Sequence, residues 1–197
     1  KGTMAPPTAP LDPAWKGHPP ARSAVVIPPP EPSARKQVAV YPYRDEEGRV
    51  LYEVVRYEPK DFRQRVPLEG GGYQWRLDGV RRVLYRLPEL LAADPLFEVF
   101  IVEGEKDADL LASVGCVTTT NVSGAGQWKP EYAQWLKDRS VVVIPDNDEP
   151  GKRHAEQVAR SLVGIASRIS ILELPGLGPK GDVSDFMQGD PDARMTE

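Results

Sequence analysis

The clearest pattern in the chain is an alternation of apolar runs with helical segments in its C-terminal half. Apolar runs of strand length occur at residues 97–102, 116–120, 140–144 and 168–174. Helical periodicity occurs between them, at residues 105–114, 129–137 and 151–162. Because strands that alternate with helices usually form a parallel sheet covered on both faces, this half predicts an α/β domain with a Rossmann-like sheet of about four strands.

The preceding region has a different, strand-like pattern. Residues 38–43 and 50–57 are rich in β-branched and aromatic residues, and the polar segment 44–49 between them is typical of a hairpin turn. Further strands are predicted at 62–66 and 73–77, on either side of three consecutive glycines. We therefore expect a small, mainly antiparallel β subdomain, followed by a short helix at 87–93 with Pro88 in its first turn.

The first 37 residues have almost no apolar periodicity and contain ten of the 21 prolines. This composition is typical of a disordered or polyproline-like linker. The predicted organisation is therefore a proline-rich tail at 1–37, a basic β-rich subdomain at 38–96 and a catalytic α/β domain at 97–190.

Acidic residues follow two of the predicted strands. Glu103 comes after the strand at 97–102, and Asp146 and Asp148 come after the strand at 140–144. In an open parallel sheet, ligands bind beyond the carboxyl ends of the strands, so these carboxylates would meet at one edge if the strands are neighbours. Hard divalent cations such as Mg²⁺ prefer carboxylate oxygens and retain waters and substrate phosphates as further ligands. The pattern predicts a metal-dependent phosphoryl-transfer site.

These motifs resemble those of the TOPRIM domain of bacterial-type DNA primases, topoisomerases and some nucleases, and in particular its primase branch. The resemblance spans about residues 97–187 and includes the Glu103-Gly104-x-x-Asp107 motif, the Asp146-x-Asp148 motif and Gly151. It implies catalytic and metal-binding roles for Glu103, Asp146 and Asp148. It also implies further acidic positions of the metal site at Asp107, Asp182 and Asp185.

Structural roles remain an alternative for some of these residues. Acidic residues that follow strands are often N-caps, and Asp107 and Asp148 are each placed to cap a helix. Phosphate contacts are predicted at Lys106 and Lys152 and at the amides of a glycine-containing loop, through Gly124 and Gly126. A plain glycine turn explains that loop equally well.

Charge is unevenly distributed along the chain. Residues 97–197 carry ten basic and seventeen acidic side chains, whereas residues 60–86 carry seven basic and three acidic ones, interleaved with aromatic residues. Arginines and aromatic rings on one sheet suit single-stranded nucleic acid, and the residues predicted to contact it are Arg63, Arg65, Arg81 and Arg82. The alternative is that the rings face the core and the arginines are ion-paired or solvated.

Other site classes are excluded by composition. One cysteine and two histidines are too few for a disulfide framework or a zinc ribbon, and His154 is expected on a helix surface. No apolar stretch is long enough to cross a bilayer, and the start of the chain has no signal-peptide pattern. A cytoplasmic protein without a membrane partner is the expectation.

The predicted function is primase-type nucleotidyl transfer: synthesis of short primers on a single-stranded DNA template from nucleoside triphosphates, with Mg²⁺ or Mn²⁺ as cofactor. A TOPRIM nuclease would use the same carboxylates with water as the nucleophile, and a non-catalytic nucleic-acid-binding module of a larger replication protein is the third possibility. The resemblance implies a replicative helicase and a zinc-ribbon domain as partners, in the same chain or on another.

Overall fold

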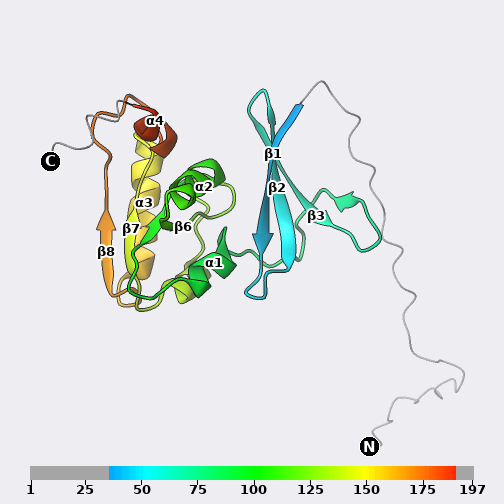
Figure 1. The fold of residues 1–197 in the computed structure, drawn as a ribbon, viewed down its shortest axis with the longest axis horizontal. Coiled ribbons are helices and arrows are strands. Elements are labelled where there is room, and N and C mark those ends of the chain that lie inside the picture. The colour runs from blue at the N-terminus through cyan, green and yellow to red at the C-terminus, as the bar shows by residue number, and fades with distance from the viewer. Residues whose placement is uncertain (1–35, 190–197) are drawn as a thin grey trace, which may run out of the picture.

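A computed structural model of the chain describes residues 36–189. Two four-stranded sheets make up this part of the protein, one antiparallel and one parallel. Figure 1 shows them side by side, with the antiparallel sheet in blue and cyan and the parallel sheet with its helices in green to orange. The α/β fold prediction is confirmed, whereas the proline-rich segment predicted at 1–37 lies almost wholly outside the described residues.

The antiparallel sheet is a meander in which each strand pairs with the next. Its strands are β1 (Lys36–Arg44), β2 (Val50–Glu58), β3 (Asp61–Pro67) and β4 (Tyr73–Gln74). The predicted hairpin joins β1 to β2, and Asp45 closes it by accepting hydrogen bonds from the backbone amides of Glu47 and Arg49. Strand β4 is shorter than the predicted 73–77 because the chain leaves the sheet and buries Leu77 in the core.

The parallel sheet has the order β6-β5-β7-β8. Its strands are β5 (Val99–Ile101), β6 (Val117–Thr119), β7 (Ser140–Val143) and β8 (Arg168–Ile171). Helix α2 (Glu105–Ser113) connects β5 to β6, and helix α3 (Glu149–Leu162) connects β7 to β8. These two connections run in opposite directions across the sheet, so right-handed crossovers place the two helices on opposite faces. The predicted strands and helices of this region are therefore present, with bounds shifted by a few residues.

Three helical segments differ from the expectation. The segment η1 (Pro130–Leu136) is a 3₁₀ helix, in which residues three apart align, so that Ala133 and Leu136 are buried on one side. Helix α3 begins two residues before the predicted start because Asp148 caps it. Helix α4 (Val183–Gln188) was not predicted. Among the described residues, no helix combines the length and apolar character that crossing a bilayer requires.

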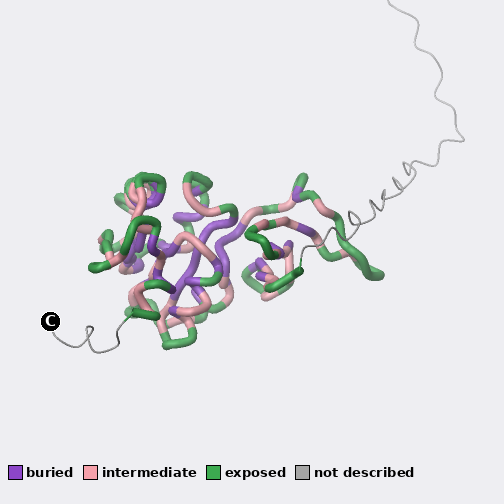
Figure 2. Tube along the Cα trace, turned by 90° about the horizontal axis from the view of Figure 1, so that it is seen from above, coloured by how far each residue is buried: buried purple, intermediate pink, exposed green. Residues whose placement is uncertain are grey.

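One continuous core joins the two sheets. Figure 2 shows the buried backbone in purple running through the middle of the molecule. Tyr43 and Tyr52 of the antiparallel sheet stack at a centroid distance of 4.6 Å, and the Tyr43 hydroxyl donates to Glu105 Oε1 of α2 at 2.8 Å. Helix α1 (Leu87–Ala92) connects the sheets, with Leu87 and Leu90 buried. This packing fixes the antiparallel sheet against α2, next to the predicted site.

Candidate active site

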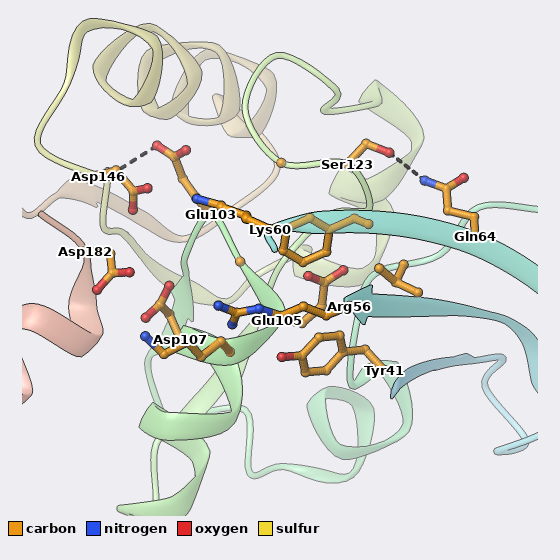
Figure 3. A pocket seen from close by; sticks show the side chains of 15 residues that line it. Tyr41, Arg56, Lys60, Gln64, Glu103, Glu105, Asp107, Ser123, Asp146 and Asp182 are labelled. Atoms are coloured by element: carbon orange, nitrogen blue, oxygen red, sulfur yellow. Dashed lines mark hydrogen bonds between the residues drawn. The ribbon is translucent and has the colours of Figure 1, made fainter. Parts of the chain in front are cut away.

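Glu103 and Asp146 follow two neighbouring parallel strands. Strands β5 and β7 pair directly, so the two loops that carry these residues leave the sheet side by side. The backbone amide of Asp146 donates to Glu103 Oε1 at 3.1 Å, and both side chains line one pocket (Figure 3). The structure therefore brings the first two predicted catalytic carboxylates together at the expected edge of the sheet.

Gly151 permits this close approach. A Cβ atom at this position would lie 2.3 Å from Glu103 Oε1 and 2.7 Å from the carbonyl oxygen of Asp146. No side chain fits there without moving the acidic loops, because real Cβ atoms do not come so near to other heavy atoms. Steric crowding thus explains why a glycine occupies position 151, which its spacing in the motif did not reveal.

Asp107 and Asp182 extend the acidic wall of the pocket. Asp107 lies in the first turn of α2, where its Oδ1 accepts hydrogen bonds from the amide and the hydroxyl of Ser184 at 3.0 and 2.5 Å. Asp182 caps α4, and Asp185 completes a capping box with it. Asp182 lines the pocket but Asp185 does not. Asp107 therefore ties α4 to α2 and brings Asp182 next to the other carboxylates.

Asp148 lies in a different position from that expected. Its Oδ1 accepts a hydrogen bond from the amide of Gly151 at 2.8 Å, so it is the N-cap of α3 and does not line the pocket. Among residues 36–189, no three acidic, histidine or cysteine side chains are close enough together to hold one metal ion. The expected convergence of Glu103, Asp146 and Asp148 on a common cation is thus not preformed, because capping α3 turns Asp148 aside.

Within the acidic wall, Glu103 and Asp146 have no cationic partner among the described residues. Burial, followed by the negative charge of Glu103, raises the pKa of Asp146 to about 7. Burial also raises the pKa values of Glu103 and Asp107 above their usual range. Like charges in a partly desolvated site disfavour ionisation unless a cation neutralises them. This donor set fits a hard divalent cation, with phosphate oxygens and waters completing its coordination.

The opposite wall of the pocket comes from the antiparallel sheet. The cavity has a volume of about 520 Å³, and Phe62 is one of its lining residues. Across the cavity, the carboxylates are faced by Tyr41, Arg56, Lys60 and Gln64 (Figure 3). Arg56 and Lys60 were not singled out in the sequence, where they are two among many basic residues. Only the β2–β3 pairing, which places them beside the acidic loops, reveals them.

Lys106 also lines the pocket, as predicted for a phosphate contact, and its charge lies near Asp107. Lys152 instead lies outside the pocket, where its Nζ donates to Glu173 Oε2 at 3.2 Å. Among the described residues, Arg56, Lys60 and Lys106 form no ion pair. Three positive charges in or beside the cavity are therefore available to an anionic ligand.

Arg63 and Arg65, predicted to contact nucleic acid, have partners within β2 and β3. Arg65 is buried, with its Nε 2.7 Å from Glu53 Oε2 and its guanidinium 3.6 Å from the centroid of the Tyr73 ring. Arg63 pairs with Asp61 at 3.2 Å. Arg65 has little surface for a ligand, and the ion-paired alternative describes it better.

Arg81 and Arg82 lie away from the carboxylates, in a second hollow of the surface. Arg81 pairs with Glu46 and stacks over the ring of Trp135. Arg82 donates to the carbonyl oxygens of Leu77 and Val80 and holds the turn between them. The structure therefore does not gather the four arginines on one path to the pocket.

The predicted glycine loop borders the pocket through Ser123 and Gly124. The amide of Gly126 points elsewhere and donates to Nδ1 of His154 at 3.0 Å. His154 is only 3% exposed, so the expectation of a surface histidine was wrong. The apolar residues one turn away on α3 could have indicated that His154 lies on the buried face.

The chain is similar to a phage protein over part of its length. No protein-family model matches the chain. The gene 57 protein of Mycobacterium phage D29 is 39% identical over 66 residues, which cover 33% of this chain and 43% of that protein. The chain thus spans less than half of this phage relative.

Two solved structures share the fold. The primase fragment of the bacteriophage T7 primase-helicase superposes with a TM-score of 0.52 and 18% identity, over 78% of this chain and 58% of that one. The DnaG primase catalytic domain bound to single-stranded DNA superposes with a TM-score of 0.55 and 22% identity, over 79% of this chain and 50% of that one. The chain has the fold of a primase catalytic core. In this primase-type fold, the pocket lies between the parallel sheet and the antiparallel sheet.

Proposed function

We propose that the protein is a primase-type nucleotidyl transferase that synthesises short primers on single-stranded DNA from nucleoside triphosphates. The observation that carries this proposal is the composition of the pocket. Five carboxylates line the same cavity as three cationic side chains: those of Glu103, Glu105, Asp107, Asp146 and Asp182 with those of Arg56, Lys60 and Lys106. A negatively charged ligand that arrives with divalent cations satisfies both sets of charges, and a nucleoside triphosphate is such a ligand.

Mg²⁺ or Mn²⁺ would be held chiefly by Asp146, with Glu103 and Asp182 as further carboxylates. A bound divalent cation neutralises phosphate charge and orients an attacking hydroxyl for in-line displacement. Because Mg²⁺ typically takes only one or two protein carboxylates beside substrate phosphates, a site without three preformed ligands suits it. Asp148 would contribute by fixing the start of α3 and thereby the loop that carries Asp146.

The remaining roles follow from the side chains themselves. Glu103 has a raised pKa because it is half-buried, so its carboxylate is a suitable acceptor for the proton of a primer 3′-hydroxyl. Arg56, Lys60 and Lys106 would bind the phosphates of the incoming nucleotide. When the bond to the α-phosphate breaks, the departing pyrophosphate gains one negative charge. These cations would stabilise that charge as it develops.

The proposed template is single-stranded DNA, because the DnaG domain with this fold was solved with that ligand. A replicative helicase is the proposed partner, since the T7 relative is part of a primase-helicase protein. A zinc-ribbon domain for template recognition would be supplied in the same chain or on another. Arg63 remains a candidate for a template contact, and we place the activity in the cytoplasm.

Primer synthesis with the Asp146→Asn variant tests the proposal. The full chain is incubated with single-stranded DNA, labelled ribonucleotides and Mg²⁺ or Mn²⁺, and both oligomer synthesis and template degradation are scored. We expect Asp146→Asn to reduce synthesis at least a hundredfold, with unchanged folding and DNA binding, because it removes a ligand charge but keeps the side-chain shape.

The same assay separates the other two functions. Shortening of DNA by the wild type without use of nucleotides would establish the nuclease. Binding of DNA with neither activity, when zinc-ribbon and helicase partners are present, would leave a non-catalytic module.

A further inference from the structure

His154 lies on the buried face of α3, in direct contact with the loop at the mouth of the pocket. Its Nδ1 accepts a hydrogen bond from the amide of Gly126 at 3.0 Å, and its Nε2 lies 3.1 Å from Oδ1 of Asn121. Both side chains are almost fully buried, at 3% and 1% exposure. A histidine with both ring nitrogens bonded inside the protein has a fixed orientation.

The hydrogen bonds define one protonation state. A backbone amide can only donate, so Nδ1 is the acceptor and the ring proton is on Nε2, which donates to Asn121 Oδ1. The Nδ2 group of Asn121 then donates to the carbonyl oxygens of Val122 and Gly124, at 3.2 and 2.8 Å. Every polar group in this chain of contacts is thus satisfied by a complementary partner.

The loop held in this way has an unusual backbone. Ser123, Gly124 and Gly126 all have positive φ angles, of 68°, 65° and 77°. A serine in this region is uncommon and persists where neighbouring contacts impose it. The conformation presents Ser123 and Gly124 to the pocket, and the Ser123 hydroxyl accepts a hydrogen bond from Gln64 Nε2 of β3 at 2.7 Å.

We propose that His154 is a positioning residue, which acts with Asn121 to hold loop 122–126 as the wall that joins the two halves of the pocket. The chain of contacts runs from α3, through His154 and Asn121, to the loop and on to Gln64 of the antiparallel sheet. This inference rests on the proposed function, since it assigns the loop to binding of the nucleotide in that pocket. It names a residue that touches neither the carboxylates nor the cations of the site.

The competing explanation is that His154 only fills space in the core. The two explanations predict different results when Nδ1 and Nε2 of the ring are replaced separately. In His154→Asn, the amide oxygen takes a position close to that of Nδ1 and can still accept from Gly126. In His154→Gln, the amide group reaches the position of Nε2 and can still bond Asn121, but the Gly126 amide loses its acceptor.

The experiment measures nucleotide KM and kcat in primer synthesis, together with amide hydrogen exchange of loop 122–126, for the full chain and both variants. We expect His154→Gln to raise the KM for nucleotides about tenfold with kcat changed less than about threefold, because a lost hydrogen bond on this scale loosens the loop. Exchange at Gly126 should accelerate about tenfold. His154→Asn should keep both values within about threefold of wild type.

Val158→Ala is the matched control, because Val158 is fully buried one turn further along α3. It should lower stability without changing KM or the exchange of the loop. Equal behaviour of His154→Asn and His154→Gln, or the same KM increase in Val158→Ala, would overturn the proposal. If the wild type makes no primers, the proposed function fails, while Gly126 exchange in the two variants still tests the positioning role.

Discussion

The two walls of the pocket treat their charges in opposite ways. On the side of the parallel sheet, Asp146 and Glu103 have no cationic partner among the described residues, and burial with repulsion between carboxylates raises their pKa values. On the antiparallel sheet, Arg65 and Arg63 are paired with Glu53 and Asp61 from the same sheet. Charged side chains without an ion-pair partner thus line the pocket, whereas the ion-paired arginines belong to the framework of the antiparallel sheet.

This difference provides a criterion for separating ligand-binding charges from structural ones. A buried charge without a partner costs free energy, so it persists where a ligand or metal supplies the missing countercharge. A paired arginine already has its countercharge and contributes to the fold. By this criterion, Arg56, which is half-buried and has no ion pair among the described residues, belongs with the carboxylates and Arg65 does not.

After Asp146→Asn, Gly151→Ala should have the largest effect on activity. The added methyl group would meet Glu103 Oε1 and the Asp146 carbonyl, so the two carboxylates must move apart. Displacements of about 1 Å at a reacting centre cost about a hundredfold in rate, and we expect that loss in primer synthesis. Gly178→Ala is the matched control, since a Cβ there meets nothing within 4 Å. Equal losses in both variants would show that displacement of the carboxylates is not the cause, and full activity of Gly151→Ala would show that the acidic wall tolerates movement.

Arg65→Met should have the largest effect on stability. It leaves Glu53, whose side chain is 17% exposed, without its partner, and we expect a loss of about 2.5 kcal/mol in the free energy of unfolding. The double variant with Glu53→Gln should recover most of this loss. Arg63→Met, at a more exposed pair, should cost about 0.5 kcal/mol. Urea denaturation of the four proteins measures these differences, and a neutral Arg65→Met would remove the scaffold role.

Much of the fold was predictable because its signals are local. Buried parallel strands have continuous apolar sequences and the helices between them have regular periodicity, so the four strands from β5 to β8 were all recognised. Helix α4 was missed because its six residues give too short a pattern, and its acidic cap looked like a ligand pair. The 3₁₀ character of η1 depends on packing, which periodicity does not report.

The site was only partly predictable, for a different reason. Glu103 and Asp146 were identifiable because each directly follows a strand, and adjacent strands bring their ends together. The partners of Arg81 and Arg82 come from other segments and from backbone carbonyls, which no count of charges along the chain can locate. The same holds for His154, whose contacts are 28 and 33 residues away in sequence.

The pH dependence of stability tests whether the carboxylates of the acidic wall lack a countercharge. Asp146 has a pKa of about 7 in the folded protein against 3.8 ordinarily, so the folded state binds the extra proton between those values. The free energy of unfolding without metal should therefore fall as pH rises from about 4 to 7, by on the order of 2 kcal/mol, and level off above. Asp146→Asn should remove most of this fall.

Divalent cations provide the control for this titration. Added Mg²⁺ should raise the free energy of unfolding at pH 8, where Asp146 is ionised, and have little effect at pH 5, where it is protonated. Thermal or urea unfolding at the two pH values measures both effects. Stabilisation by Mg²⁺ that is equal at pH 5 and pH 8 would contradict the assignment of Asp146 as a metal ligand.

Arg56→Gln should have the smallest effect and is the direct test of the criterion on the basic side. Arg56 faces the carboxylates across the pocket, with its guanidinium 5.8 Å from the centroid of the Phe62 ring. Loss of one charge-assisted contact to a phosphate should weaken nucleotide binding about tenfold, measured by fluorescence titration in the presence of Mg²⁺. Arg81→Gln removes the same charge from a residue already paired with Glu46, away from the pocket, and should leave the affinity within about twofold. If Arg81→Gln weakens binding as much as Arg56→Gln, then net charge rather than position governs binding, and internal pairing does not separate scaffold arginines from ligand-binding ones.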